Sequence, residues 1–109
     1  QVRAAVPHIR VRVHFHNTRG TGLANVWAAI EAGAVTVDAS IGGLGGCPFA
    51  PGAAGNVSTE DVVYMLERAG VRTGLDLSAL VSANHWLGEI MQRTLPGMVA
   101  KAPPFPKQA

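Results

Sequence analysis

The stretch HIRVRVHFHNTRGTGLANVWAAIEAGAVTVDASIG, residues 8–42, decides the fold of this chain. Its beginning alternates between polar and apolar residues, which predicts a β-strand with two unlike faces. The polar face carries Arg10, Arg12, His14 and His16. Residues 21–33 then place apolar side chains at helical spacing and close on Gly33, as an amphipathic helix does. Residues 34–42 are β-branched and bounded by glycines, so they predict a second strand. A strand, a helix and a strand in so few residues form a βαβ unit with parallel strands.

Two further helices are predicted after this unit. Residues 58–70 open with Ser58 as a helix N-cap, carry Glu60 and Asp61 in the first turn and end at Gly70. Residues 77–95 form a longer helix. Its expected apolar face is Leu77, Leu80, Val81, Leu87, Ile90 and Met91. The proline-rich segment 96–109 is expected to be loose, and we place the domain over 1–100 with a tail over 101–109.

Composition narrows the class of protein. The chain has 109 residues, of which 48% are hydrophobic and 15% charged, so it is long enough for one globular domain with a core. The net charge is only +2 and the basic residues are scattered, so we expect no nucleic-acid partner. A single cysteine allows no intrachain disulfide, and neither a signal peptide nor a membrane-spanning apolar run is evident. These features predict a cytoplasmic protein without a membrane partner.

Polar faces on parallel strands need an explanation, because such strands are normally covered by apolar groups on both sides. The second strand carries Thr36, Asp38 and Ser40 on one side. A (β/α)₈ barrel accommodates such a face, since its interior near the strand C-termini is a reaction site. In this arrangement His14 and His16 point inward, and Arg12 pairs with Asp38.

His14 and His16 are the first candidate ligands of a metal ion. Histidines at positions i and i+2 of a strand project from the same face and can bind one cation together. Two imidazoles leave most of a divalent coordination shell unfilled, so further oxygen ligands are required. Asn56 can offer an amide oxygen. The alternatives are two partly exposed imidazoles near a strand end and, for Asn56, a simple turn residue.

Cys47 is the only cysteine and lies in GGLGGCPFAPGAAGN, residues 42–56, among six glycines and two prolines. It could be structural, redox-active or catalytic. A structural cysteine belongs on a regular element, and a redox thiol lacks a second cysteine in this chain. A catalytic thiol is consistent with a loop that closes over a substrate and shields it from water.

Two segments carry a resemblance to a known family. VHFHNTRGTGLANVWAAIEAG (13–33) and VTVDASIGGLGGCPFAPGAAGNVSTEDVVYMLERAG (35–70) resemble the hydroxymethylglutaryl-CoA lyases, which belong to a wider group of metal-dependent TIM-barrel lyases and aldolases. The Gly-Leu-Gly-Gly-Cys-Pro run is specific to the lyases, whereas His-x-His is shared more widely. The resemblance implies an α/β fold: the C-terminal part of a (β/α)₈ barrel, with its last two parallel strands and the helices that follow.

The resemblance also implies roles for five residues. His14, His16 and Asn56 would bind a catalytic Mg²⁺ or Mn²⁺, and Cys47 would be the catalytic cysteine on a mobile loop. Glu60 matches a functionally important acidic position of the family, although by itself it is typical of the first turn of any helix. The implied reaction is a metal-assisted retro-Claisen cleavage of 3-hydroxy-3-methylglutaryl-CoA, or of a related branched 3-hydroxyacyl-CoA.

A complete barrel needs about 250 residues, so the resemblance implies that the N-terminal half is a missing partner of this chain. The open strand edges also favour a homo-oligomer. Two alternatives remain. One is a metal-dependent aldolase or acyl-CoA synthase of the same superfamily, in which Cys47 would matter little. The other is a non-catalytic assembly fragment that binds no metal through His14.

Overall fold

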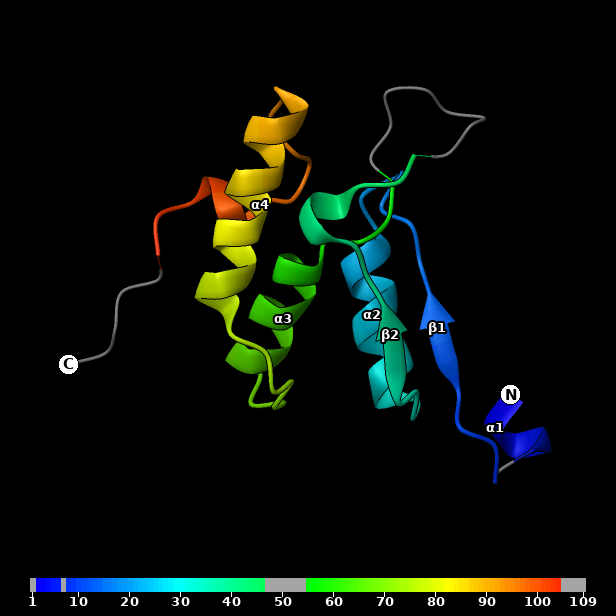
Figure 1. The fold of residues 1–109 in the computed structure, drawn as a ribbon. Helices are drawn as coiled ribbons and strands as arrows, with labels where there is room; N and C mark the ends of the chain where they lie inside the picture. Colours follow the sequence, from blue (N-terminus) through cyan, green and yellow to red (C-terminus); the bar gives the residue numbers. More distant parts are fainter. Residues whose placement is uncertain (1, 7, 47–54, 105–109) are drawn as a thin grey trace.

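A computed structural model describes residues 2–6, 8–46 and 55–104 of the chain. Its elements follow each other from the N-terminus to the C-terminus (Figure 1). They are α1 Val2–Ala5, β1 Arg12–His14, α2 Gly22–Glu31, β2 Thr36–Asp38, the 3₁₀ turn η1 Ile41–Gly43, α3 Thr59–Arg68, α4 Leu77–Met91 and the 3₁₀ turn η2 Val99–Lys101. Cys47, in the glycine loop, lies outside the described residues.

The two strands are parallel neighbours, and α2 connects them, as the βαβ prediction requires. Arg12 pairs with Thr36, and His14 pairs with Asp38. The ladder is shorter than the alternating sequence because the chain beyond His14 finds another partner. Asn17 N–H donates to Gly55 O at 2.8 Å, and Val57 N–H donates to Phe15 O at 3.4 Å. Exposure still alternates from Val11 to His16, so the predicted faces of the first strand are confirmed.

The core lies on the apolar side of this small sheet. Val26 of α2, Val62 and Leu66 of α3 and the loop residue Val57 are buried together. Val37 of β2 packs against them. Burial of such aliphatic side chains contributes about 1.5–3 kcal/mol each. The apolar face of the sheet therefore rests on α2 and α3, and the polar face is left on the other side.

Helix α4 extends past its neighbour. It has 15 residues, whereas α3 has 10, and Figure 1 shows the C-terminal end of α4 reaching beyond α3. The predicted apolar face is wrong at its end: the exposed fractions of Ile90 and Met91 are 60% and 42%. Leu77, Leu80, Val81 and Leu87 are half-buried, as predicted.

The segment after α4 is not loose at its start, which corrects the sequence prediction. Leu95 is 2% exposed, and Gly97 and Ala100 are buried. The cause is Asp61 in the first turn of α3. Its carboxylate accepts hydrogen bonds from Met98 N–H at 3.0 Å and Val99 N–H at 2.8 Å, and so fixes η2 against α3.

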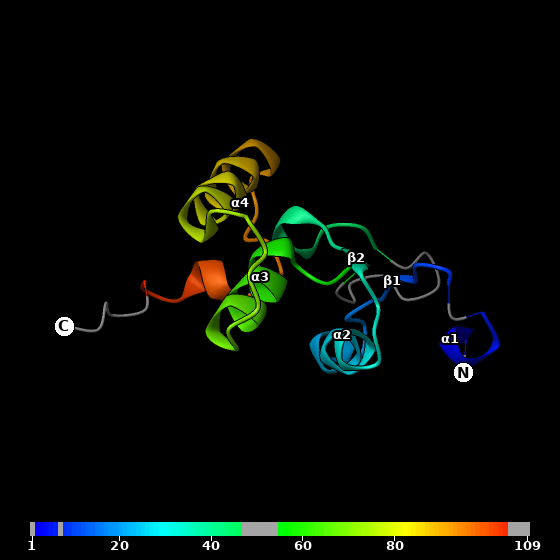
Figure 2. The ribbon, with the colours of Figure 1, turned by 90° about the horizontal axis from the view of Figure 1, so that it is seen from below.

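The whole arrangement is thin and open. Its principal extents are 46 × 46 × 19 Å, and Figure 2 shows the helices side by side with the strands near one end. The two described strands do not close on themselves, so each keeps one unpaired edge. Among the described residues, no helix is both long and apolar enough to span a bilayer.

Candidate metal centre and its surroundings

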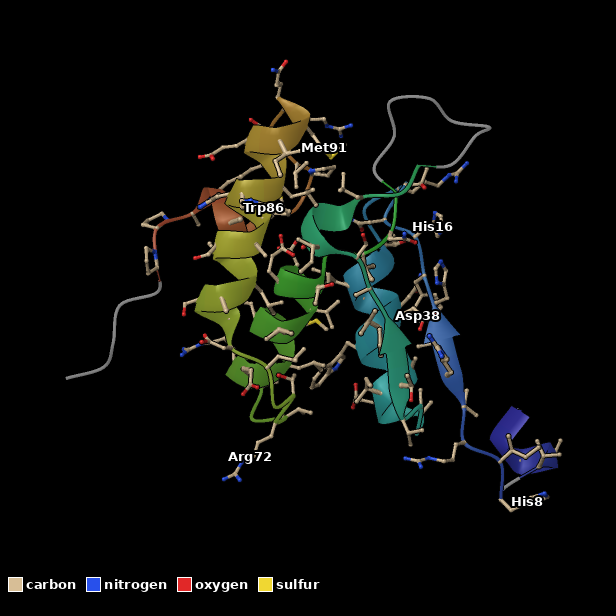
Figure 3. All side chains as sticks on the ribbon, viewed as in Figure 1. His8, His16, Asp38, Arg72, Trp86 and Met91 are labelled. Carbon is tan, nitrogen blue, oxygen red and sulfur yellow. The ribbon has the colours of Figure 1, made fainter. Side chains whose placement is uncertain are left out.

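The side chains of His14 and His16 lie next to each other on the polar face. Their ring centroids are 5.2 Å apart. Both residues are exposed, because the described part of the chain places no element over this face. Figure 3 shows His16 and Asp38 on the strand side of the molecule, far from Trp86 and Met91 on α4. Two neighbouring imidazoles on one strand face match the geometry expected for shared binding of a cation.

Asn56 joins this pair through the backbone. It forms an antiparallel bridge with His16, and the two flanking hydrogen bonds run from Asn17 to Gly55 and from Val57 to Phe15. This is the non-hydrogen-bonded type of antiparallel pair, in which the facing side chains lie closest and on the same side. The pairing of the two segments therefore brings the Asn56 amide beside the His16 ring.

The orientation of the Asn56 amide is set by the glycine loop. Its Nδ2 donates to Leu44 O at 2.9 Å. Its Oδ1 is buried and has no hydrogen-bond partner among the described residues. Gly45 has a φ of +102°, and a Cβ at this position would lie 2.5 Å from Asn56 Nδ2. The loop thus holds the amide with its nitrogen hydrogen-bonded and its oxygen without a hydrogen-bond partner among the described residues.

These three side chains fit a divalent cation. An orphaned amide oxygen is costly when buried, and coordination would offset that cost. Imidazole nitrogens with an oxygen ligand suit a first-row or hard divalent ion with open positions. Among the described residues no group of three or more histidine, cysteine, aspartate or glutamate side chains could hold a metal. Two imidazoles and one amide oxygen would fill only part of the coordination shell of such an ion.

Asp38 lies directly beside this centre. Arg12 Nε donates to Asp38 Oδ1 at 2.6 Å, so the predicted pairing of Arg12 with Asp38 is confirmed. Asp38 Oδ2 also lies 3.2 Å from His14 Nδ1, a contact that sequence reasoning missed. The hydrogen bond from Arg12, and then that from His14, hold the pKa of the Asp38 carboxyl below its ordinary value of 3.8. The signal in the sequence was the alternation of both strands, which puts His14 as well as Arg12 on the same face as Asp38.

Glu60 is buried inside the molecule, with no exposed surface. Both its oxygens lie within 3.1 Å of Gly42 N–H, and Oε2 accepts from Asn84 Nδ2 at 2.6 Å. The carboxylate thereby connects α3 to the turn after β2 and to α4. In the described part of the chain its hydrogen bonds are structural, and its assignment as a catalytic residue stays a prediction. Asn84 was missed by sequence reasoning, although a polar residue on the buried face of α4 was a signal.

Two grooves flank α4, on the far side of α3 from the histidines. One of about 860 Å³ is lined by apolar side chains such as Tyr64, Val81 and Met98. The other is lined by polar residues that include Glu89 and Lys101. His85 borders both grooves, and its Nε2 lies 2.9 Å from Ala100 O. Neither groove is lined by His14, His16 or Asn56, so both are separate from the candidate metal centre.

Comparison with known proteins identifies the family. The HMGL-like family model matches residues 1–87, and the chain therefore belongs to the HMGL-like family. Over 99 residues it is 50% identical to the (R)-citramalyl-CoA lyase of Chloroflexus aurantiacus, covering 91% of this chain and 31% of the relative. It is also 50% identical over 93 residues to the hydroxymethylglutaryl-CoA lyase YngG of Bacillus subtilis, covering 85% and 31%. The chain thus spans about a third of the length of these relatives.

Solved structures give the fold. The HMG-CoA lyase of Bacillus subtilis matches 92% of this chain and 35% of its own, with a TM-score of 0.85 and 44% identity. The structure of an HMG-CoA lyase of Acinetobacter baumannii, in complex with coenzyme A and 3-methylmalate, has a TM-score of 0.83 and 47% identity. The match covers 96% of this chain and 36% of that lyase. These neighbours are TIM barrels. The predicted fold, a C-terminal part of such a barrel with two parallel strands and helices, is confirmed.

Proposed function

We propose that this chain supplies the C-terminal part of a carbon-carbon lyase for 3-hydroxy-3-methylglutaryl-CoA or a related branched 3-hydroxyacyl-CoA. The products would be acetyl-CoA and acetoacetate, or the corresponding keto acid. The observation that carries the proposal is the pair of neighbouring imidazoles, His14 and His16, together with Asn56, which is bridged to His16 and whose amide oxygen has no hydrogen-bond partner among the described residues. Membership of the HMGL-like family supports lyase chemistry for the protein that contains this chain.

In this proposal His14, His16 and Asn56 hold Mg²⁺ or Mn²⁺. The bound cation would supply Lewis-acid stabilisation of the oxygen atoms of the substrate. The protein's own contribution is to keep three ligands on one rigid scaffold: two on a strand and one on the segment paired with it. Rigid placement of this kind lowers the entropic cost of reaching the reactive geometry. The remaining ligands would come from the missing N-terminal part of the barrel.

Cys47 is proposed as the group that delivers a proton to the acetyl-CoA enolate. A thiol is a suitable acid in a site from which water is excluded. The support is its place in the Gly-Leu-Gly-Gly-Cys-Pro run of the sequence. Glu60 is proposed to contribute to catalysis by holding the turn after β2. It accepts a hydrogen bond from Gly42 N–H, and Leu44 in the same loop accepts one from the amide of Asn56.

The acyl group is proposed from the relatives. One relative is named for citramalyl-CoA and others for hydroxymethylglutaryl-CoA, and both substrates are branched hydroxyacyl thioesters. We therefore propose a substrate of this class, with 3-hydroxy-3-methylglutaryl-CoA as the first to be tested.

The test uses the full-length protein that contains this chain, with Mg²⁺ or Mn²⁺ and both acyl-CoA substrates. We expect acetoacetate from 3-hydroxy-3-methylglutaryl-CoA and a loss of about 10²–10⁴ in kcat for Cys47→Ala, the range of general acid–base catalysis. Ser82→Ala, on an exposed position of α4, is the matched control and should retain activity. A folded, metal-loaded protein that cleaves neither substrate would contradict the proposal. Cleavage that is unchanged in Cys47→Ala would favour the metal-dependent aldolase or synthase.

A further inference from the structure

Asp38 and His14 face each other across the parallel ladder. They are register partners on neighbouring strands, and their side chains share the polar face. The contact joins Asp38 Oδ2 and His14 Nδ1 at 3.2 Å. It leaves the other ring nitrogen of His14, Nε2, without a hydrogen bond to Asp38.

The chemistry of the two groups determines where the proton sits. An ionised carboxylate accepts hydrogen bonds and donates none, so the contact requires a proton on His14 Nδ1. In a neutral imidazole the lone pair then lies on Nε2. Ligating histidines in metal sites commonly have this arrangement, with the second ring nitrogen bound to a carboxylate that fixes the tautomer and the ring orientation.

Arg12 holds the carboxylate in place for this contact. Its Nε binds Asp38 Oδ1 at 2.6 Å, so the two carboxylate oxygens have separate partners. A hydrogen bond between ionised partners is about twice as strong as a neutral one. Arg12 therefore turns Oδ1 toward itself and leaves Oδ2 directed at His14.

We propose that Asp38 is a positioning residue, which keeps His14 in the Nδ1–H form and directs Nε2 toward the divalent cation. This inference rests on the metal-binding role proposed above for His14. It adds a carboxylate that does not itself ligate the metal and an arginine that orients the carboxylate. The unit is thus Arg12, Asp38 and His14, in that order.

Asp38→Asn is the informative substitution because it keeps the shape and exchanges one oxygen for a donor. Arg12 would retain the amide oxygen, since it can only donate. The amide nitrogen would then face His14 Nδ1 and favour the tautomer with its proton on Nε2. We expect the Mn²⁺ affinity to fall by about 10- to 100-fold, as for the loss of other outer-shell partners.

Removing Arg12 as well should restore the original tautomer. In the double variant Arg12→Ala/Asp38→Asn the amide can turn, and its oxygen can accept from His14 Nδ1–H. We expect the double variant to bind Mn²⁺ more tightly than Asp38→Asn alone. A merely structural role of Asp38 predicts the opposite order, because two lost partners would then be worse than one.

The experiment measures two quantities on the full-length protein. Nitrogen-15 NMR of labelled histidines reports the His14 tautomer, and Mn²⁺ titration followed by electron paramagnetic resonance reports affinity. Asp76→Asn, which changes an exposed carboxylate that contacts no histidine, is the control. A wild-type His14 with its proton on Nε2, or an Asp38→Asn variant with unchanged affinity, would overturn the inference. Absence of Mn²⁺ binding in the wild type would overturn the metal site itself, and the tautomer would still report whether Asp38 controls His14.

Discussion

Gly45 determines how the Asn56 amide is presented. A methyl group at position 45 would lie 2.5 Å from Asn56 Nδ2, so Gly45→Ala must displace the amide and its bond to Leu44 O. We expect the full-length variant to bind Mn²⁺ at least about tenfold more weakly, as when a residue supporting a ligand is lost. Mn²⁺ titration measures the effect.

Gly20→Ala is the matched control for this variant. Gly20 also has a positive φ, +77°, but a Cβ there would meet nothing within 4 Å. Both variants carry the same type of backbone strain, of order 1 kcal/mol, and only Gly45→Ala touches the ligand. Equal Mn²⁺ affinities for the two variants would show that Asn56 does not bind the metal.

At the residue scale, the sequence predicted groups that share an element and missed groups that meet across elements. Alternation placed His14 and His16 on one face, and it placed Arg12 and Asp38 on the polar faces of neighbouring strands, which made their pairing foreseeable. The bond from Asn84 to Glu60 joins residues 24 positions apart on two helices. Periodicity describes each helix separately, so it indicates neither the partner nor the burial of such a pair.

Glu60 and Asn84 hold α4 against α3. Asn84→Ala would leave the buried carboxylate with fewer hydrogen bonds, and the lost partner of a buried polar group costs about 1–3 kcal/mol. We expect a decrease of this size in the free energy of unfolding, measured by urea denaturation of the full-length protein. Asn25→Ala, on an exposed position of α2, is the control. A loss no greater than that of the control would refute a role for this bond in stability.

Asp76 is the N-cap of α4 and makes the stability of this helix depend on pH. Its Oδ1 accepts from the Ser78 hydroxyl at 2.8 Å and from Ser78 N–H at 3.0 Å, and these bonds, with one from Ala79 N–H, lower the pKa of Asp76 below 3.8. A lowered folded-state pKa means that the stabilisation is present above about pH 4 and is lost as the pH falls through the folded-state value.

The matched pair Asp76→Asn and Asp76→Ala separates capping from charge. Asparagine caps about as well as aspartate, so we expect the Tm of Asp76→Asn at pH 7 to be close to that of the wild type. Because asparagine does not titrate, the Tm of this variant should fall less than that of the wild type between pH 7 and pH 3. Asp76→Ala should lower the Tm at pH 7. Thermal unfolding followed by circular dichroism at several pH values measures both. An Asp76→Ala variant as stable as the wild type would contradict the capping role.

At the element scale, the sequence predicted which elements exist and misjudged where they end. The βαβ unit, the Ser58 cap and both later helices are confirmed. The first strand stops at His14 because its continuation pairs with residues 55–57 in place of β2. The segment after α4 is ordered by the carboxylate of Asp61, a contact with a residue more than thirty positions away. Long-range hydrogen bonds of this kind leave no local pattern.

The molecule as a whole is an open section of a barrel. The chain covers about a third of its relatives, and its polar strand face and both strand edges are uncovered in the described part. We predict that the 109 residues alone bind Mn²⁺ more weakly than the full-length protein and release no acetoacetate. Open edges also favour self-association, which sedimentation velocity would detect. Full lyase activity of the isolated chain would contradict this account.

The fold class could be predicted because the βαβ pattern and the polar strand faces are local. The closure of the barrel could not be predicted from local patterns, since the other strands of the barrel are not among the segments of this chain. The resemblance implies a functional acid at Glu60, and the structure shows that its carboxylate is buried and bound to Gly42 and Asn84; its catalytic role stays a prediction.

The most direct measurement is the Mn²⁺ affinity of the full-length protein and of two histidine variants. His16 lies at the proposed centre beside Asn56, whereas His8 is exposed on the segment before β1. We predict that His16→Ala weakens Mn²⁺ binding at least about tenfold and that His8→Ala leaves it unchanged. Equal binding by the two variants would contradict the claim that this strand face holds the metal.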